Sequence, residues 1–169
     1  MVKDINLRFD EKIKNLEEIL PKLEMETNCA ALTLTNILEV LGVDNFYFHN
    51  LAVPLAGGFG GFKSLKGWKG PCGAVCGGCA AIGIIVGGQK KLAQNLEAYQ
   101  TAAKFVHYFE KEFGSTTCYE LCGIDFSDLD SANKYIENKK WEQQCYKYVI
   151  FAINKVRELT ASDLKKKWT

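Results

Sequence analysis

Apolar residues recur at three- and four-residue intervals along much of the chain, and this spacing restricts the fold more than any other sequence feature. Within residues 3–20 the apolar positions follow it, with charged residues between them, at Ile5, Phe9, Ile13, Leu16 and Leu20. Such spacing places apolar side chains on one face of a helix. Strand-like alternation is nearly absent, so the sequence predicts an all-α fold.

Helix-ending residues divide the chain further. Pro21 closes the first segment, and a second helix is expected to begin with Thr27 or Asn28 as its N-cap and to stop at Gly42. Residues 46–53 suit either a short helix or an extended piece. Later helices are predicted over residues 72–86, 89–113, 115–121, 128–137 and 141–159, followed by a solvated Lys-rich tail. We therefore expect one domain, residues 1–169, built as a bundle of about five to seven helices.

A glycine-rich segment, residues 55–70, precedes the central helix and reads LAGGFGGFKSLKGWKG. Glycine at this density predicts a loop whose backbone turns tightly or approaches another group closely. The loop supplies candidate cofactor-binding residues, namely Gly58, Gly60, Gly61 and Trp68. Trp68 would line a flat aromatic pocket, or it would cover the core.

Composition narrows the class of protein. The formal net charge is +1 and there are two arginines, so the sequence gives no support for nucleic-acid binding. The longest apolar stretch, residues 80–86, is too short to span a bilayer, and no targeting segment is visible, so a cytoplasmic location is expected. In a reducing compartment, seven cysteines favour metal binding or catalysis over structural disulfides.

Three of the cysteines are concentrated on the predicted helix 72–86. Cys72, Cys76 and Cys79 are spaced four and three residues apart, which places them on one helix face. Cys76 and Cys79 form a C-x-x-C, a spacing used by redox pairs and by half of a metal site. Cys72 follows Pro71 in the first helical turn, where the positive helix end should lower the pKa of a thiol.

The chain resembles a known family in the order of these motifs. Residues 72–77 read C-G-A-V-C-G, residues 78–83 read G-C-A-A-I-G, and Asn28-Cys29-Ala30 opens an earlier helix. Over residues 28–159 the sequence is similar to the C_GCAxxG_C_C family of redox-active proteins. The resemblance implies that the recurring cysteines are Cys29, Cys72, Cys118 and Cys145, with Cys79 as the alternative to Cys72.

The resemblance extends to split-Soret cytochromes, which carry haem-attachment motifs. No histidine follows Cys79, so the C-x-x-C-H signature is missing and covalent haem is not expected here. Three cysteines, Cys76, Cys79 and Cys122, lie outside the recurring set. They suggest a metal or cluster that simpler relatives lack.

Three functional hypotheses follow. In the first, an oxidoreductase or electron-transfer protein uses Cys72 as attacking thiolate. Its partner would be another redox protein or a small-molecule electron acceptor. The resolving thiol comes from the remaining candidates, which are Cys29, Cys76, Cys118 and Cys145. The sequence leaves the oligomeric state open, and a homodimer is compatible with it.

The second hypothesis is a thiolate-bound metal or iron–sulfur cluster. Its ligands would be drawn from Cys72, Cys76, Cys79, Cys118 and Cys122. The third is a non-enzymatic helical interaction module in which the cysteines are packing residues, because free cysteine is often a small buried side chain.

Overall fold

The computed structural model describes residues 4–22, 27–44, 46–87 and 95–168, and its ordered elements are helical. The described residues contain no β-strand, so the prediction of an all-α fold is confirmed. The α-helices are α1 (Ile5–Ile19), α2 (Cys29–Leu41), α3 (Phe46–Ala52), α4 (Gly57–Gly61), α5 (Gly73–Val86), α6 (Leu96–Phe113), α7 (Cys118–Cys122), α8 (Leu129–Glu137), α9 (Tyr146–Leu159) and α10 (Ala161–Lys167). Short turns lie at Leu20–Lys22, Val53–Leu55 and Trp141–Cys145, the last a π-helix.

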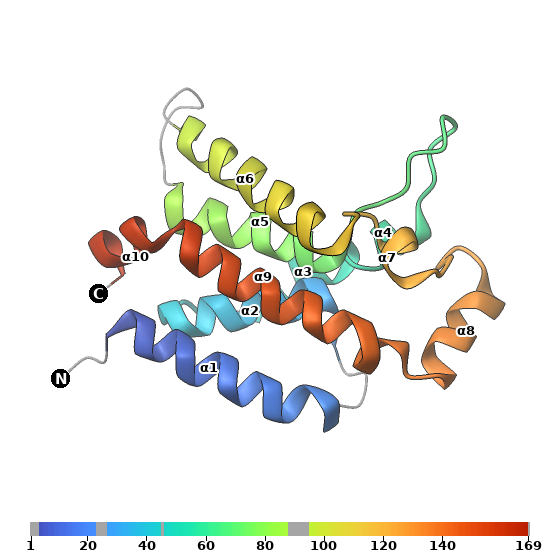
Figure 1. Ribbon diagram of the computed structural model, residues 1–169, viewed down its shortest axis with the longest axis horizontal. Coiled ribbons are helices and arrows are strands. Elements are labelled where there is room, and N and C mark those ends of the chain that lie inside the picture. Colours follow the sequence, from blue (N-terminus) through green and yellow to red (C-terminus); the bar gives the residue numbers. More distant parts are fainter. Residues whose placement is uncertain (1–3, 23–26, 45, 88–94, 169) are drawn as a thin grey trace.

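The five long helices lie side by side (Figure 1). Helices α2 and α5 pack against each other, α9 contacts both, α1 covers α2 and α9, and α6 covers α5 and α9. Helices α2, α5 and α9 all begin at the same end of the molecule, where the short helices α3, α4, α7 and α8 gather (Figure 1). This shared end is the one that carries most of the cysteines.

Glycines on α5 allow its neighbours to approach closely. A Cβ atom at Gly77 would lie 2.5 Å from the carbonyl oxygen of Ala30, and one at Gly78 would lie 2.5 Å from the Phe105 ring. The α2–α5 and α5–α6 contacts therefore depend on positions without side chains. The surrounding core is fully buried and includes Phe9, Leu16, Leu34, Ile37, Ile82, Phe109 and Ile153.

Capping chemistry fixes the two ends of α2. Asn28 is the N-cap, and its Oδ1 accepts hydrogen bonds from the N–H groups of Ala30 (3.1 Å) and Ala31 (3.0 Å). Gly42 closes the helix in the left-handed conformation, with φ 74°. The predicted choice between Thr27 and Asn28 is thereby resolved in favour of Asn28.

The predicted count of five to seven helices is wrong, because the structure has more. Residues 46–52 are helical, and the expected loop begins with a helical turn, α4. Its five residues all have positive φ, from 56° at Phe59 to 85° at Gly61, so the turn is left-handed. Glycine adopts positive φ without steric cost, so the four glycines allow this left-handed turn to form. The turn explains the glycine density better than an open loop does.

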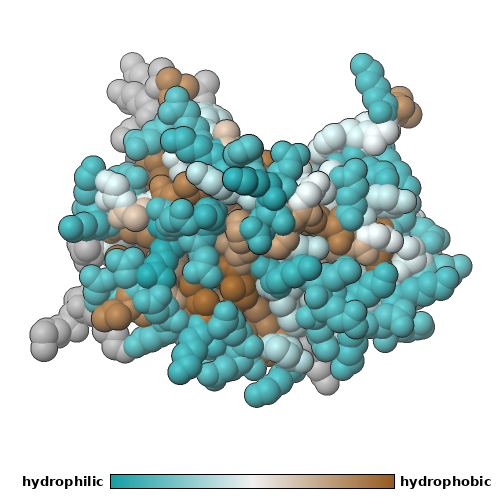
Figure 2. Space-filling view, viewed as in Figure 1, coloured by the Kyte–Doolittle hydropathy of each residue, from teal (hydrophilic) through white to brown (hydrophobic). Residues whose placement is uncertain are grey.

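A hairpin-like projection follows α4 and stands out from the molecule in Figures 1 and 2. A single β-bridge joins Lys63 and Lys69 at its base, and Leu65 between them is fully exposed. The Lys63 ammonium pairs with the Asp125 carboxylate and ties this base to the segment after α7. Elsewhere, the face shown in Figure 2 is mainly hydrophilic.

Two other boundaries differ from expectation. The helix predicted over residues 115–121 begins instead at Cys118, as α7. Thr117 is its N-cap, because the Thr117 side chain accepts a hydrogen bond from the Glu120 N–H, and the Ser115 hydroxyl donates to the Glu120 carboxylate. The predicted solvated tail forms α10, since Leu164 is 1% exposed and fixes this segment against α5 and α9. The predicted helix start at residue 89 lies outside the described residues.

The sequence predicted that no segment is long and apolar enough to span a bilayer. No helix in the described part of the chain combines the length and apolar character that crossing a bilayer would require.

Candidate thiol redox site

Five cysteines meet where α2, α5 and α9 begin. Cys29 is the first residue of α2, Cys72 is the N-cap of α5, and Cys145 directly precedes α9. Cys118 and Cys122 are the first and last residues of α7. Partial positive charge at the N-termini of α2 and α5 favours a thiolate at this end of the bundle, whereas Cys145 lies inside a continuous helical run, because the π-helix Trp141–Cys145 leads directly into α9.

Backbone pairing brings α7 beside the start of α5. Pro71 and Thr117 form an antiparallel bridge, the Cys72 N–H donates to the Thr116 carbonyl (2.7 Å), and the Cys118 N–H donates to the Gly70 carbonyl (3.2 Å). These bonds hold Cys118 and Cys72 on adjacent segments although 46 residues separate them in the sequence. Sequence spacing alone gave no indication of this pairing.

Cys29 and Cys72 form the outer thiol pair. Hydrogen bonding between the Cys29 and Cys72 thiols is the largest cause of the lowered Cys29 pKa. Backbone N–H groups of Gly73 and Ala74 also donate to Cys29 Sγ, and together these donors outweigh the opposing effect of burial. Gly73 is required for the approach, because a Cβ atom there would lie 2.5 Å from Cys29 Sγ.

The pKa of Cys72 is raised well above its usual value. The hydrogen bond with Cys29 is the largest cause, followed by burial and by the negative charge on Cys29. The sequence predicted Cys72 as the ionised thiol of this helix terminus. The pKa directions of the pair are opposite to that expectation, lowered for Cys29 and raised for Cys72, and the role of Cys72 stays a prediction.

Cys122 and Cys145 form an inner pair with a Sγ–Sγ distance of 3.7 Å. Both are buried, and the Tyr135 hydroxyl lies 3.0 Å from Cys145 Sγ. A hydrogen bond with Cys118 and burial raise the pKa of Cys122 to about 12, and its bond to Cys122, together with burial, raises the pKa of Cys145 further. Both inner thiols are therefore protonated at neutral pH.

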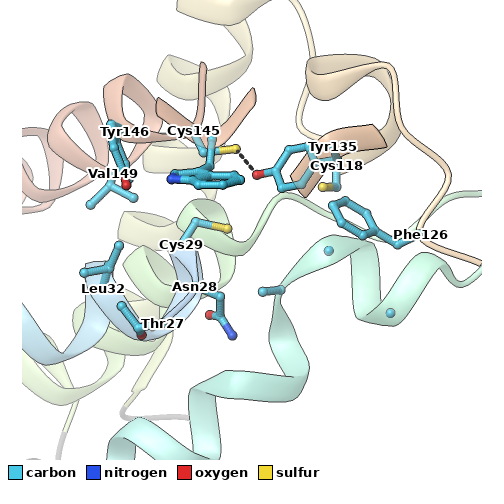
Figure 3. A pocket seen from close by; sticks show the side chains of 14 residues that line it. Thr27, Asn28, Cys29, Leu32, Cys118, Phe126, Tyr135, Cys145, Tyr146 and Val149 are labelled. Atoms are coloured by element: carbon cyan, nitrogen blue, oxygen red, sulfur yellow. Dashed lines mark hydrogen bonds between the residues drawn. The ribbon is translucent and has the colours of Figure 1, made fainter. Parts of the chain in front are cut away.

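Three of these thiols line a cavity of about 330 Å³ (Figure 3). The sulfur atoms of Cys29, Cys118 and Cys145 come from three different helical elements around it. Most of the remaining wall is aromatic or aliphatic and includes Leu32, Phe126, Tyr135, Trp141, Tyr146 and Val149. A reactive thiol at the wall of an apolar cavity is an arrangement suited to chemistry on a small bound molecule.

Cys76 and Cys79 lie apart from this cavity wall. Cys79 lines a separate depression between α5 and α6 with Gly83 and Tyr99. Burial is the main cause of raised pKa values in both, to about 12 for Cys76 and about 11 for Cys79. The predicted grouping on one helix face therefore does not place all three α5 cysteines at one site.

The predicted metal ligands were Cys72, Cys76, Cys79, Cys118 and Cys122. Among the residues that the structure describes, which include all seven cysteines, no group of three or more Cys, His, Asp or Glu side chains is arranged to hold a metal ion. The metal-site hypothesis stays a prediction.

The four residues predicted to bind a cofactor have different positions. Gly60 lines the cavity. Gly58 and Gly61 permit close backbone contact. A Cβ atom added at Gly58 would lie 3.0 Å from the Gly70 carbonyl oxygen, and one added at Gly61 would lie 2.2 Å from the Ser127 nitrogen. Trp68 is half-exposed on the projection, where it contacts the rings of Phe59 and Phe62.

Sequence reasoning missed the aromatic residues of the site, above all Tyr135 and Trp141. Both lie in the segment that joins α7 to α9, which folds over the cavity. One available signal was the cluster of aromatic residues around the last cysteine, which includes Trp141, Tyr146 and Tyr148 beside Cys145.

Comparison with known proteins gives a match to one family. The family described as "Putative redox-active protein (C_GCAxxG_C_C)" matches residues 27–159. No curated protein and no solved structure matches the chain. The family match covers most of the chain and includes all five cysteines gathered at the helix N-termini. The chain belongs to the C_GCAxxG_C_C family of redox-active proteins.

Proposed function

We propose that this protein is a thiol–disulfide oxidoreductase in which Cys29 is the attacking thiolate and Cys72 the resolving thiol. The observation that carries the proposal is the environment of Cys29 Sγ. It lies at the cavity wall and against the start of α5, where a Cβ atom on Gly73 would be 2.5 Å from it, and hydrogen bonding with Cys72, Gly73 and Ala74 lowers the pKa of Cys29. A thiolate is the nucleophile in disulfide exchange, so the stabilised thiolate should react first.

The exchange proceeds in two balanced steps. Cys29 thiolate attacks one sulfur of a substrate disulfide, which forms a mixed disulfide and releases the other half as a thiolate that takes up a proton. Cys72 then loses its proton to solvent or to that leaving thiolate, and its sulfur attacks Cys29 Sγ. The second half of the substrate leaves, so that one substrate disulfide is reduced and one Cys29–Cys72 disulfide forms.

The raised pKa of Cys72 is compatible with its resolving role. Two of the causes that raise the pKa of Cys72 involve Cys29: the hydrogen bond between the two thiols and the negative charge of the Cys29 thiolate. Both disappear once Cys29 is part of a mixed disulfide. The Ala74 N–H, which lowers the pKa of Cys72, remains available to it.

The inner thiols offer a route for moving the disulfide inward. Cys118 interacts electrostatically with Cys72 and by hydrogen bond with Cys122, which in turn lies 3.7 Å from Cys145. Successive exchanges would transfer the disulfide from Cys29–Cys72 to Cys72–Cys118, Cys118–Cys122 and finally Cys122–Cys145. Each exchange forms one S–S bond and breaks another, so no further oxidant is needed.

The test is to map disulfides after limited oxidation. Reduced protein, purified without oxygen, is mixed with one equivalent of hydroxyethyl disulfide, and its cystine peptides are identified by mass spectrometry. We expect Cys29–Cys72 to be the first disulfide in the wild type, and we expect Cys29→Ser to abolish it. The Cys79→Ser variant is the matched control and should oxidise like the wild type.

Two results would overturn the proposal. One is a coloured protein with bound iron and fewer than seven titratable thiols, which would favour the cluster hypothesis. The other is a set of thiols that remain unreactive until the protein is denatured. That result would leave the cysteines as packing residues.

A further inference from the structure

The wall of the cavity beside Cys29 is mainly aromatic and aliphatic. Apart from the Cys29 thiolate of the proposed function, the described residues that line it include no Asp, Glu, Lys, Arg or His, and four aromatic residues, Phe126, Tyr135, Trp141 and Tyr146, contribute to it. Its volume of about 330 Å³ lies at the lower end of small-molecule sites. A folded partner or an extended peptide would not enter a space of this size.

Three polar side chains at the wall are engaged within the protein, whereas Trp141 Nε1 is buried without a hydrogen-bond partner. Asn28 Oδ1 accepts from Ala30 and Ala31 while its Nδ2 donates to the Val53 carbonyl (3.1 Å). Thr27 Oγ1 lies 3.1 Å from His49 Nε2, and the Tyr135 hydroxyl contacts Cys145 Sγ. An anionic ligand would therefore give up its hydration without gaining an ion-pair partner, and it would also face the Cys29 thiolate, which is costly.

We infer that the oxidising substrate of this site is a small uncharged disulfide that carries aromatic groups. The inference rests on the proposed function and adds the chemical class of its substrate. The aromatic groups would pack against the ring-lined wall, with one sulfur presented to Cys29 Sγ. Attack by Cys29 thiolate breaks the substrate S–S bond and releases one aryl thiolate. Attack by Cys72 on Cys29 Sγ releases the second, so two aryl thiols and one Cys29–Cys72 disulfide result.

The test compares four disulfides that differ in charge and aromatic character. Dithiodipyridine is aromatic and uncharged at neutral pH, dithiobis(nitrobenzoate) is aromatic and anionic, hydroxyethyl disulfide is uncharged without rings, and glutathione disulfide is charged without rings. Each rate of Cys29 oxidation is divided by the rate of free cysteine with the same compound. We expect dithiodipyridine to exceed both charged compounds on the order of ten-fold after this correction.

A cavity-filling variant tests whether the preference arises in the cavity. Leu32 lines the wall one turn after Cys29 on α2, so Leu32→Phe should remove most of the preference for dithiodipyridine. Its rate with hydroxyethyl disulfide, which is smaller and has no rings, should fall less, and an unchanged circular-dichroism spectrum would show that the variant is folded. The matched control Leu7→Phe, at an exposed position of α1, should leave both rates unchanged.

The possible failures are distinct. If Cys29–Cys72 forms with hydroxyethyl disulfide but charged and uncharged aromatic compounds react equally, or the anionic one reacts faster, the substrate class is wrong and the oxidoreductase proposal stands. A faster anionic compound would mean that the positive helix ends decide selection. If no disulfide oxidises Cys29 faster than free cysteine, both proposals are overturned.

Discussion

At the scale of single residues, the site depends on which of two neighbouring thiols carries the negative charge. Cys29 and Cys72 share one hydrogen bond, and it lowers the pKa of Cys29 while raising that of Cys72. The Gly73 N–H lowers the pKa of Cys29 alone, whereas the Ala74 N–H lowers the pKa of both thiols. The usual thiol pKa is about 9.0, so Cys29 becomes a thiolate at lower pH than an ordinary cysteine.

A pair of substitutions at Cys72 tests this assignment. Cys72→Ala removes the largest cause of the lowered Cys29 pKa, so the pH midpoint for Cys29 alkylation should move upward. Cys72→Ser keeps an O–H donor and should retain most of the lowering. Each unit of pKa increase reduces the thiolate fraction at neutral pH about ten-fold, as residue-resolved iodoacetamide kinetics would measure. Equal midpoints in wild type and Cys72→Ala would contradict the assignment.

At the scale of helices, α5 is built to approach its neighbours closely. Gly73 admits Cys29 Sγ and Gly77 admits the Ala30 carbonyl, so the two glycines allow the thiol pair to form and α2 to pack. Gly83 on the same helix has nothing within 4 Å of its Cβ position. Helix α5 therefore contains glycines required for packing and one that is not.

These glycines give a matched pair of variants. Gly77→Ala should destabilise the protein by about 1–3 kcal/mol, because the new methyl group would overlap backbone atoms of α2. Gly83→Ala should stabilise it by roughly 0.5–1 kcal/mol through helix propensity. Urea unfolding of both variants measures the difference. Equal effects would mean that α5 does not pack on α2 as described.

At the scale of the whole molecule, one core joins residues from both ends of the chain. It extends from Ile5 on α1 to Leu164 on α10, and the Lys167 ammonium donates to the Val86 carbonyl (3.1 Å) at the end of α5. Helix α10 therefore completes the end of the bundle opposite the cysteines (Figure 1). Its loss should weaken the fold without touching the thiol site.

Leu164→Ala tests this role of α10. Removing a side chain that is 1% exposed should lower the free energy of unfolding by about 2–5 kcal/mol. The exposed neighbour Lys165→Ala should change it by less than about 0.5 kcal/mol. Thermal unfolding followed by circular dichroism provides the comparison. Similar melting temperatures for both variants would show that α10 does not belong to the core.

The sequence allowed the fold class to be predicted more fully than the site. Local signals, such as the Asn28 cap and the helical spacing of residues 3–20, are read directly from neighbouring residues, and they correctly predicted most helices. The thiol partners come from residues far apart in sequence: α2 packing on α5 brings Cys29 to Cys72, and the Pro71–Thr117 bridge brings Cys118 beside Cys72. Helical spacing grouped Cys72 with Cys76 and Cys79, because it could not include the contact of α2 with the start of α5.

The central claim is that Cys29 is the stabilised thiolate of the site, and residue-resolved alkylation of the native, reduced wild-type protein tests it most directly. The account predicts that Cys29 is modified first at neutral pH, with a pH midpoint below 9.0, and that Cys79 reacts more slowly although both side chains are only partly buried. Modification of Cys72 or Cys79 ahead of Cys29, or no modification before denaturation, would contradict it.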